Sequence, residues 1–416
     1  MAKPRILIVT ESPHFASGYS GVARNLAKSF TRKFDIGFLA WGWSGYLPSY
    51  HEISEKANLS SPAKFYHVIG NRFGTDVFDV VVDSFKPDVI FYLADTFMLM
   101  GNLAAQVQKY RGKICQVFYF PVDGDCFPLP WVPFLQQFDG LVAFTEYAKR
   151  EIGKVTQDLK VDVLHHGVDL NTFKPVPPSE KKQLKEKLLP FAKDKFLVSW
   201  VGRNFVRKNP QAILQALSHW EKNLGGVPKD LVLYMHTSDN DPAGFPLTEV
   251  IKRDFPEITP FVFFPANHNI NDGIPINLLA NIYQASDLFV STAMGEGWGL
   301  PITEAMASKV PVIVPDNSAC KEQAGESEER AVAVECPTSL YATHNVVQKL
   351  VDPRKLAEAM KAAYENPEAS KARVNAAFNW TQDHDWSDLG RTMTNLVWGY
   401  LERTKTRIAP SIIERA

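Results

Sequence analysis

The sequence has few cysteines, and they are not grouped. Its 416 residues include Cys115, Cys126, Cys320 and Cys336, none of which forms a CxxC pair. This spacing argues against a structural zinc site. Scattered cysteines also favour a reducing compartment, so we expect a cytoplasmic location.

Long apolar runs are lacking as well. The run ILIV near the N-terminus is too short for the apolar core of a signal peptide and is typical of a strand. No run reaches the roughly 18 apolar residues that a membrane-spanning helix needs. We therefore expect neither a signal peptide nor a transmembrane segment.

The sequence has no excess of charge of one sign. It has 45 Lys and Arg against 46 Asp and Glu, and residues 1–180 carry 18 of each kind. A domain that binds lipid headgroups or DNA phosphates is usually basic. A nucleic-acid acceptor is therefore possible, but the charge does not indicate one.

Short apolar runs alternate with segments of helical spacing along the whole chain. The predicted strands of the first half are residues 5–10, 35–40, 88–94, 114–120, 140–145 and 161–166. Those of the second half are residues 196–202, 231–237, 261–266, 287–292 and 310–315. This alternation predicts an α/β fold, with parallel sheets covered by helices on both faces.

The rhythm breaks at residues 171–188, where three prolines precede a charged run. We read this segment as a linker and the first helix of a second unit. The predicted domains are residues 1–175, residues 176–384 and a C-terminal helix from 385 to 416. Ligands of open α/β sheets bind beyond the carboxyl ends of the strands.

The stretch GEGWGLPITEAMA (residues 295–307) holds Glu296 and Glu304, with seven residues between them. Pro301 suits the first position of a helix, so the amides near Gly299 and Leu300 should point out of the helix start and attract an anion. A carboxylate can accept two protons from a vicinal diol. The stretch therefore fits a sugar nucleotide. The alternative is that Glu304 complements the helix dipole and Glu296 is an ordinary loop residue.

A second loop follows the predicted strand 196–202. Arg203 and Lys208 flank this loop, and Pro210 lies near the start of the next helix. Two cations at a helix start suit a diphosphate. The alternative is a surface loop with ordinary basic residues.

Together these motifs resemble the family 4 glycosyltransferases of the GT-B fold. The matching segments are ASDLFVSTAMGEGWGLPITEAMA, KVPVIVPDNSACKEQAG, VGRNFVRKN and the hinge segment HHGVDLNTFKP. The resemblance covers nearly all of residues 160–330. It implies two Rossmann-like domains that face each other across a cleft, with an N-terminal acceptor domain and a C-terminal donor domain. It also implies a last helix that crosses back to the first domain, and here that helix would bury Trp386 and Trp398.

The resemblance assigns roles in binding a nucleotide-diphosphate sugar. Arg203 and Lys208 would hold the diphosphate, Glu304 the ribose and Glu296 the transferred sugar. The backbone near the sugar and phosphate would come from Gly297, Trp298, Gly299 and Leu300. The implied enzyme is a retaining glycosyltransferase that needs no metal and no cofactor. Its implied catalytic residues are Arg203, Lys208, Glu296 and Asp123.

The glycine loop at residues 12–25 lacks the GxGxxG pattern of a dinucleotide site. By resemblance, Gly21 would face the donor; the alternative is a plain turn between a strand and a helix. His14 and Tyr19 from this loop and Trp43 from an aromatic run are our candidates for binding the acceptor. Packing in the core is the alternative for these aromatic residues.

Asp123 and Asp125 form a DxD pattern, but DND and DHD elsewhere show that the pattern carries little information. In family 4 a His-Asp pair often stands here, and Val122 replaces the histidine. We still expect Asp123 in the active site. No carboxylate stands out as a nucleophile, so we favour same-face transfer over double displacement.

The expected function is transfer of a sugar from a nucleotide-diphosphate sugar to an unidentified acceptor hydroxyl. The acceptor class could be a glycan, a lipid, a small molecule or a modified nucleobase. The alternatives are a non-catalytic subunit that binds sugar nucleotides and another GT-B activity such as an epimerase.

Overall fold

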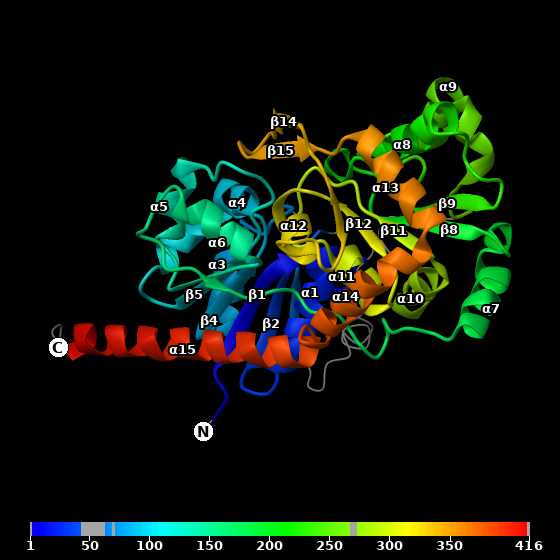
Figure 1. Cartoon of the computed structure of the whole chain (residues 1–416). Coiled ribbons are helices and arrows are strands. Elements are labelled where there is room, and N and C mark those ends of the chain that lie inside the picture. Colours follow the sequence, from blue (N-terminus) through cyan, green and yellow to red (C-terminus); the bar gives the residue numbers. More distant parts are fainter. Residues whose placement is uncertain (1, 43–62, 69–70, 267–272, 414–416) are drawn as a thin grey trace. The chain divides into compact units, whose positions relative to one another are not determined.

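The chain divides into two units in the computed structural model, which describes residues 2–42, 63–68, 71–266 and 273–413. Unit 1 comprises Met1–Val122, Phe127–His166 and Trp386–Ala416. Unit 2 comprises Asp123–Cys126 and Gly167–Asp385 (Figure 1). Each unit is built on its own parallel sheet, as the alternation of apolar runs predicts.

Unit 1 contains a seven-stranded parallel sheet in the order β3-β2-β1-β4-β5-β6-β7. Its strands are β1 (Arg5–Glu11), β2 (Asp35–Trp41), β3 (Lys64–His67), β4 (Val89–Leu93), β5 (Cys115–Phe120), β6 (Gly140–Ala143) and β7 (Asp162–Val163). Every residue of β4 and β5 is buried, which explains their unbroken apolar sequences. All six predicted strands are present, and β3 is the strand that the sequence analysis missed.

The helices of unit 1 connect these strands, except for the last helix, which follows unit 2 in the chain. They are α1 (Gly18–Phe30), α3 (Phe78–Phe85), α4 (Thr96–Tyr110), α5 (Val132–Leu135), α6 (Glu146–Gly153) and α15 (Trp386–Ile413). Helix α1 begins after Ser17, whose hydroxyl oxygen accepts a hydrogen bond from the amide of Ser20 at 3.1 Å. Such a cap satisfies an amide that would otherwise be unpaired at the helix start.

The last helix, α15, packs on α1 of unit 1. Gly390 lies against Ser29, and the ring of Trp398 lies 5.8 Å from that of Phe34. Tyr400 bonds to the carboxylate of Asp162. The predicted return of the C-terminal helix to the first domain is therefore confirmed. Trp386 is buried as expected, and Trp398 is half-buried.

Unit 2 contains a six-stranded parallel sheet in the order β10-β9-β8-β11-β12-β13. Its strands are β8 (Phe196–Val201), β9 (Leu231–His236), β10 (Val262–Phe263), β11 (Leu288–Val290), β12 (Val312–Pro315) and β13 (Val332–Val334). A separate antiparallel hairpin is formed by β14 (Thr338–Tyr341) and β15 (Val347–Leu350). The sequence analysis predicted the first five strands and missed β13 and the hairpin.

Helices cover both faces of this sheet, because two apolar clusters lie on its opposite sides. The helices are α7 (Pro178–Leu188), α8 (Pro210–Asn223), α9 (Leu247–Asp254), α10 (Ile276–Ala285), α11 (Leu300–Ala307), α12 (Ser318–Ala324), α13 (Pro353–Glu365) and α14 (Lys371–Gln382). Helices α8 and α13 pack together on one side, and α10, α11 and α14 contribute to the other.

The boundary between the units differs from the predicted one at residue 175. Contacts place Gly167 and the residues after it in unit 2. The amide of Val168 donates to the carbonyl of His384 at 2.8 Å, and the ring of Phe173 lies 5.9 Å from that of Tyr283. These contacts fasten the segment before the prolines to unit 2, which the sequence pattern does not reveal.

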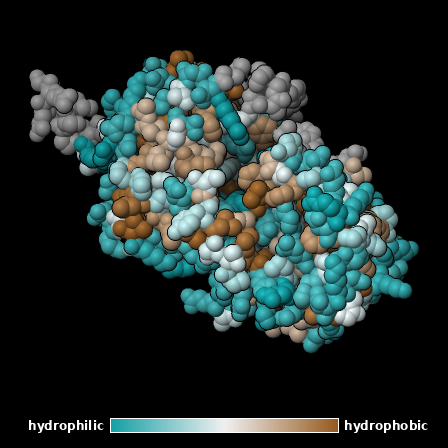
Figure 2. All heavy atoms as spheres, turned by 90° about the horizontal axis from the view of Figure 1, so that it is seen from above, coloured by the Kyte–Doolittle hydropathy of each residue, from teal (hydrophilic) through white to brown (hydrophobic). Residues whose placement is uncertain are grey.

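Hydrophilic residues cover much of the face drawn in Figure 2. Among the described residues, the large hydrophobic side chains left exposed are Val80, Phe97, Leu129, Phe205, Val206, Ile276 and Tyr341. No helix within the described ranges is both long enough and apolar enough to cross a membrane.

Candidate functional site

The glycine-rich loop after β11 leads into α11, as the sequence predicts. Gly299 caps the helix with a φ of 96°, a conformation that favours glycine. The amide of Glu296 donates to Oγ of Ser318 at 2.9 Å, and Gln323 donates to the carbonyl of Trp298 at 2.5 Å. These bonds from α12 hold the loop at the start of α11.

Trp298 takes part in this loop through its backbone, while its side chain is buried. The indole nitrogen donates to Oγ1 of Thr303 at 3.0 Å, and the ring stacks near Trp380 and His384. The indole therefore anchors the loop within unit 2. Gly297 and Leu300 beside it are partly exposed.

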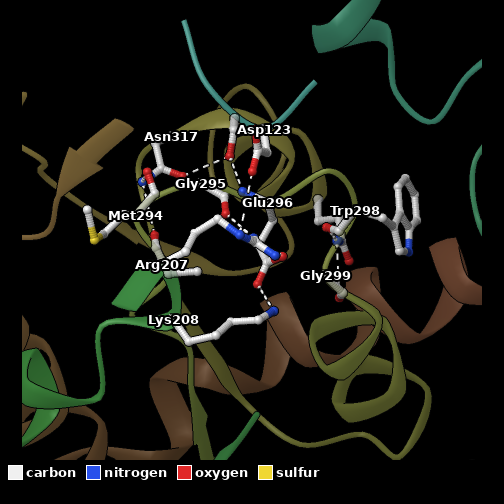
Figure 3. A network of polar contacts seen from close by, with 12 residues as sticks. Asp123, Arg207, Lys208, Met294, Gly295, Glu296, Trp298, Gly299 and Asn317 are labelled. Atoms are coloured by element: carbon white, nitrogen blue, oxygen red, sulfur yellow. Dashed lines mark hydrogen bonds and ion pairs between the residues drawn. The ribbon is translucent and has the colours of Figure 1, made fainter. Parts of the chain in front are cut away.

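Glu296 is buried, and two cations bind its carboxylate. Lys208 pairs with Oε1, and Nη1 of Arg207 donates to Oε2 at 2.9 Å (Figure 3). Burial alone would raise the pKa of Glu296, but the charges and hydrogen bonds of Lys208 and Arg207 outweigh it and lower the pKa to about 2. The carboxylate is therefore held in its ionised form.

The loop before α8 places these cations. Residues Val206–Lys208 form a short 3-10 turn that ends at Asn209, which has a φ of 50°. Thr292 donates to the carbonyls of Lys208 and Asn209, and Trp200 donates to Thr292 at 2.9 Å. Strands β8 and β11 therefore fix the turn from which Lys208 reaches Glu296.

Arg203 and Lys208, the two predicted diphosphate ligands, have different partners in the structure. Arg203 binds Asp241 through two hydrogen bonds of 2.7 and 3.2 Å, and the Arg203 side chain is 55% exposed. Arg207 is the arginine that shares Glu296 with Lys208. Arg207 was not among the predicted site residues, although its place next to Lys208 in VRKN is a usable signal.

A hollow opens at the carboxyl ends of β8 and β11, where the parallel sheet predicts a ligand site. Its lining residues are Trp200, Val201, Lys208, Ser291, Ala293, Glu296, Gly299, Pro301 and Ile302. The hollow is thus lined both by Lys208, from the loop before α8, and by Glu296 and the start of α11.

Glu304 lies in α11, and its carboxylate accepts a hydrogen bond of 2.9 Å from the hydroxyl of Tyr283 in α10. Burial raises the pKa of Glu304 to about 7, and the bond from Tyr283 opposes this rise. Glu304 therefore stands near its titration point at neutral pH, in contrast to Glu296.

Asp123 joins the same cluster from another part of the chain. Its Oδ2 lies 3.5 Å from Nε of Arg207 (Figure 3). Its Oδ1 lies 3.1 Å from Nε2 of His344. His344 lies in the turn between β14 and β15. No local spacing pattern pointed to His344.

The candidates from unit 1 lie in and before α1. Gly21 is in the first turn of α1, and its amide donates to the carbonyl of Ser17 at 3.0 Å. His14 is buried with Nδ1 2.7 Å from Oγ of Ser12, and Tyr19 is half-buried in α1. Trp43 lies outside the described residues.

Two further aromatic residues of unit 1, Trp41 and Trp131, are buried. Trp41 packs edge-on against Phe73, and Trp131 packs edge-on against Phe127. Their environment is that of core packing, the alternative that the sequence left open. Within the part of the chain that the structure describes, no cluster of three or more His, Cys, Asp or Glu residues could hold a metal ion.

Residues 265–380, which include Glu296 and Glu304, match the family described as glycosyl transferases group 1. The loop with Arg203 and Lys208 lies ahead of the matched residues. A galactosyltransferase of Escherichia coli, UDP-Gal:alpha-D-GlcNAc-diphosphoundecaprenol alpha-1,3-galactosyltransferase, is 29% identical over 161 residues. That match covers 38% of this chain and 36% of the length of the relative.

Solved glycosyltransferase structures share the fold over nearly the whole chain. Sucrose-phosphate synthase from Thermosynechococcus elongatus superposes with a TM-score of 0.76 at 16% identity, covering 97% of this chain and 100% of that one. Anabaena HepE, crystallised with UDP and glucose, has a TM-score of 0.67 at 15% identity and covers 95% of this chain and 100% of its own. The chain therefore has the GT-B fold, as predicted.

Proposed function

We propose that the protein is a retaining glycosyltransferase that moves a sugar from a nucleotide-diphosphate sugar to an acceptor hydroxyl. The main observation in support is that Lys208 and Arg207 both bind the carboxylate of Glu296, just before the start of α11. A diphosphate needs cations and helix amides, and a sugar needs hydrogen-bond acceptors. This group of residues offers both within one unit.

The donor is proposed to be a UDP-sugar. The E. coli relative uses UDP-Gal by name, and HepE was crystallised with UDP-glucose. In this proposal Glu304 accepts the ribose hydroxyls and Glu296 accepts hydroxyls of the transferred sugar. Lys208 and the arginines of its loop stabilise the diphosphate as it leaves, and no metal is required.

The proposed reaction proceeds on one face of the sugar. The bond between the anomeric carbon and the donor phosphate oxygen breaks, and the acceptor oxygen bonds to that carbon from the same side. The departing phosphate oxygen takes the acceptor proton. Buried free thiols at Cys115 and Cys320 suit a reducing compartment, so we propose the cytoplasm.

A two-step experiment tests this function. Thermal unfolding with UDP, GDP, ADP and their glucose conjugates should show the largest stabilisation with UDP and UDP-glucose, because ligands of the native state raise its melting temperature. Incubation with the stabilising nucleotide sugar should then release nucleotide and free sugar, and NMR should show retention at the anomeric carbon.

Other outcomes of these two steps would support a different function or stereochemistry. Binding without cleavage of any tested nucleotide sugar would favour a non-catalytic subunit, and formation of a new nucleotide sugar would favour an epimerase. Inversion at the anomeric carbon would refute the proposed stereochemistry.

A further inference from the structure

Four residues of unit 2, Asp123–Cys126, are flanked in sequence by residues of unit 1. They are bound to the hairpin of β14 and β15. The amide of Asp125 donates to the carbonyl of Val347, and the amide of Val347 donates to the carbonyl of Asp125, both at 2.9 Å. Lys349 adds an ion pair to Asp125 at 2.7 Å. The segment is thus attached to the edge of the hairpin.

Glycines allow this segment to lie close to its neighbours. A Cβ on Gly124 would lie 2.6 Å from the carbonyl oxygen of Val347, and a Cβ on Gly295 would lie 1.8 Å from that of Asp123. Neither distance permits a side chain. The backbone of Asp123 therefore lies directly against the residue that precedes Glu296.

The side chain of Asp123 is held at both oxygens. His344 lies 3.1 Å from one and Arg207 lies 3.5 Å from the other. The same Arg207 donates to Glu296 at 2.9 Å and to the carbonyl of Gly295 at 2.5 Å. One guanidinium therefore lies between two carboxylates (Figure 3). Asp123 is 14% exposed and His344 is 13% exposed, so water weakens these contacts little.

We infer that His344 and Arg207 are positioning residues that hold the carboxylate of Asp123 beside that of Glu296, so that the two carboxylates together bind hydroxyls of the transferred sugar. This inference rests on the proposed function. A carboxylate orients hydroxyls only if its own position is fixed, because a small displacement weakens catalysis strongly. The hairpin of β14 and β15 supplies that fixed position through His344.

Kinetic measurements on His344 variants test whether the position of Asp123 affects catalysis on the donor sugar. We expect His344→Ala to leave the affinity for UDP within twofold and to lower kcat for UDP-glucose hydrolysis about ten- to hundredfold. His344→Gln should restore most of kcat, because its amide N–H can donate to Asp123. His219→Ala, which alters a half-buried histidine of α8, should match the wild type. Equal loss of UDP and UDP-glucose binding in His344→Ala, together with a lower melting temperature, would overturn the inference.

Amide hydrogen exchange tests the position of the segment without any donor. His344→Ala should accelerate exchange at the amides of Asp125 and Val347 about tenfold or more, while amides of β8 keep their rates. Unchanged exchange at both amides would overturn the inference. If the wild type binds neither UDP nor UDP-glucose, the proposed donor fails, and the exchange rates still decide whether His344 holds the segment.

Discussion

The hydroxyl of Tyr283 donates a hydrogen bond of 2.9 Å to Oε2 of Glu304. Tyr283 is fully buried in α10, and burial raises the pKa of Glu304 to about 7. The hydroxyl acts in the opposite direction, because it stabilises the ionised carboxylate. If Glu304 binds the ribose, the charge state that binds two hydroxyls is therefore only partly populated at neutral pH.

We expect the affinity for uridine to rise about tenfold between pH 6 and pH 8, because ionisation of Glu304 through a pKa of about 7 creates the better acceptor. Tyr283→Phe should move the rise to higher pH, since it removes the bond that lowers the pKa. Calorimetric titration with uridine avoids ionisation of a phosphate. Glu304→Gln should abolish the pH dependence, and a flat profile in the wild type would refute the ribose assignment.

Lys208→Ala should destabilise the fold in a pH-dependent way. The pKa of Glu296 is lowered to about 2, so its ionised form stabilises the native state above pH 4.5, and this stabilisation is lost as the pH falls toward 2. Urea unfolding should show a loss of about 1–3 kcal/mol at pH 7 and a smaller loss at pH 3.

The matched control for this variant is Lys222→Ala. Lys222 is 54% exposed and pairs with Glu257, so its loss should cost less than about 1 kcal/mol. Equal losses in the two variants at pH 7 would contradict the account of Glu296.

Arg203→Ala should weaken UDP binding by about 1.5–3 kcal/mol and leave uridine binding unchanged, if Arg203 holds the diphosphate as the family resemblance implies. Asp241→Asn should cause a smaller loss of UDP affinity, because this variant keeps the Arg203 cation and weakens only the contact that holds it in place. Calorimetry with UDP and uridine measures both effects. Unchanged UDP affinity in Arg203→Ala would leave Arg207 and Lys208 as the pair that binds the diphosphate.

Gly390→Ala should destabilise unit 1 by about 1–3 kcal/mol, because its Cβ would lie 2.1 Å from Oγ and 2.8 Å from Cβ of Ser29. Gly399→Ala in the same helix is the control, since its Cβ would meet only the end of Arg403 at 3.5 Å. The control should keep or raise the stability. Thermal unfolding compares the two variants, and equal melting temperatures would contradict the packing of α15 on α1.

Much of the fold could be predicted because buried parallel strands have continuous apolar sequences. The segments RILIVT and LVLYMHT became β1 and β9. The hairpin of β14 and β15 could not be predicted in this way. TSLY is largely exposed and VQKL is only partly buried, so neither segment carries the apolar pattern of a core strand.

The candidate site likewise has parts that could be predicted from the sequence and parts that could not. Gly299 and Pro301 specified the helix start at α11 locally, through φ and the missing amide hydrogen. The pairing of cations with Glu296 was not local, because Lys208 lies 88 residues from it. The partners of the two arginines were not local either: Arg207 reaches Glu296 from the 3-10 turn, and Arg203 binds Asp241.

The sequence by itself determined two parallel α/β units, a glycine-rich helix start with two glutamates, and a basic loop after β8, because each depends on residues adjacent along the chain. Only the tertiary structure decided that Arg207 lies between Asp123 and Glu296 and that His344, 221 residues beyond Asp123, contacts the carboxylate of Asp123. The physical reason is that a hydrogen bond depends on distance in space, and chain spacing does not encode that distance across two sheets and a hairpin.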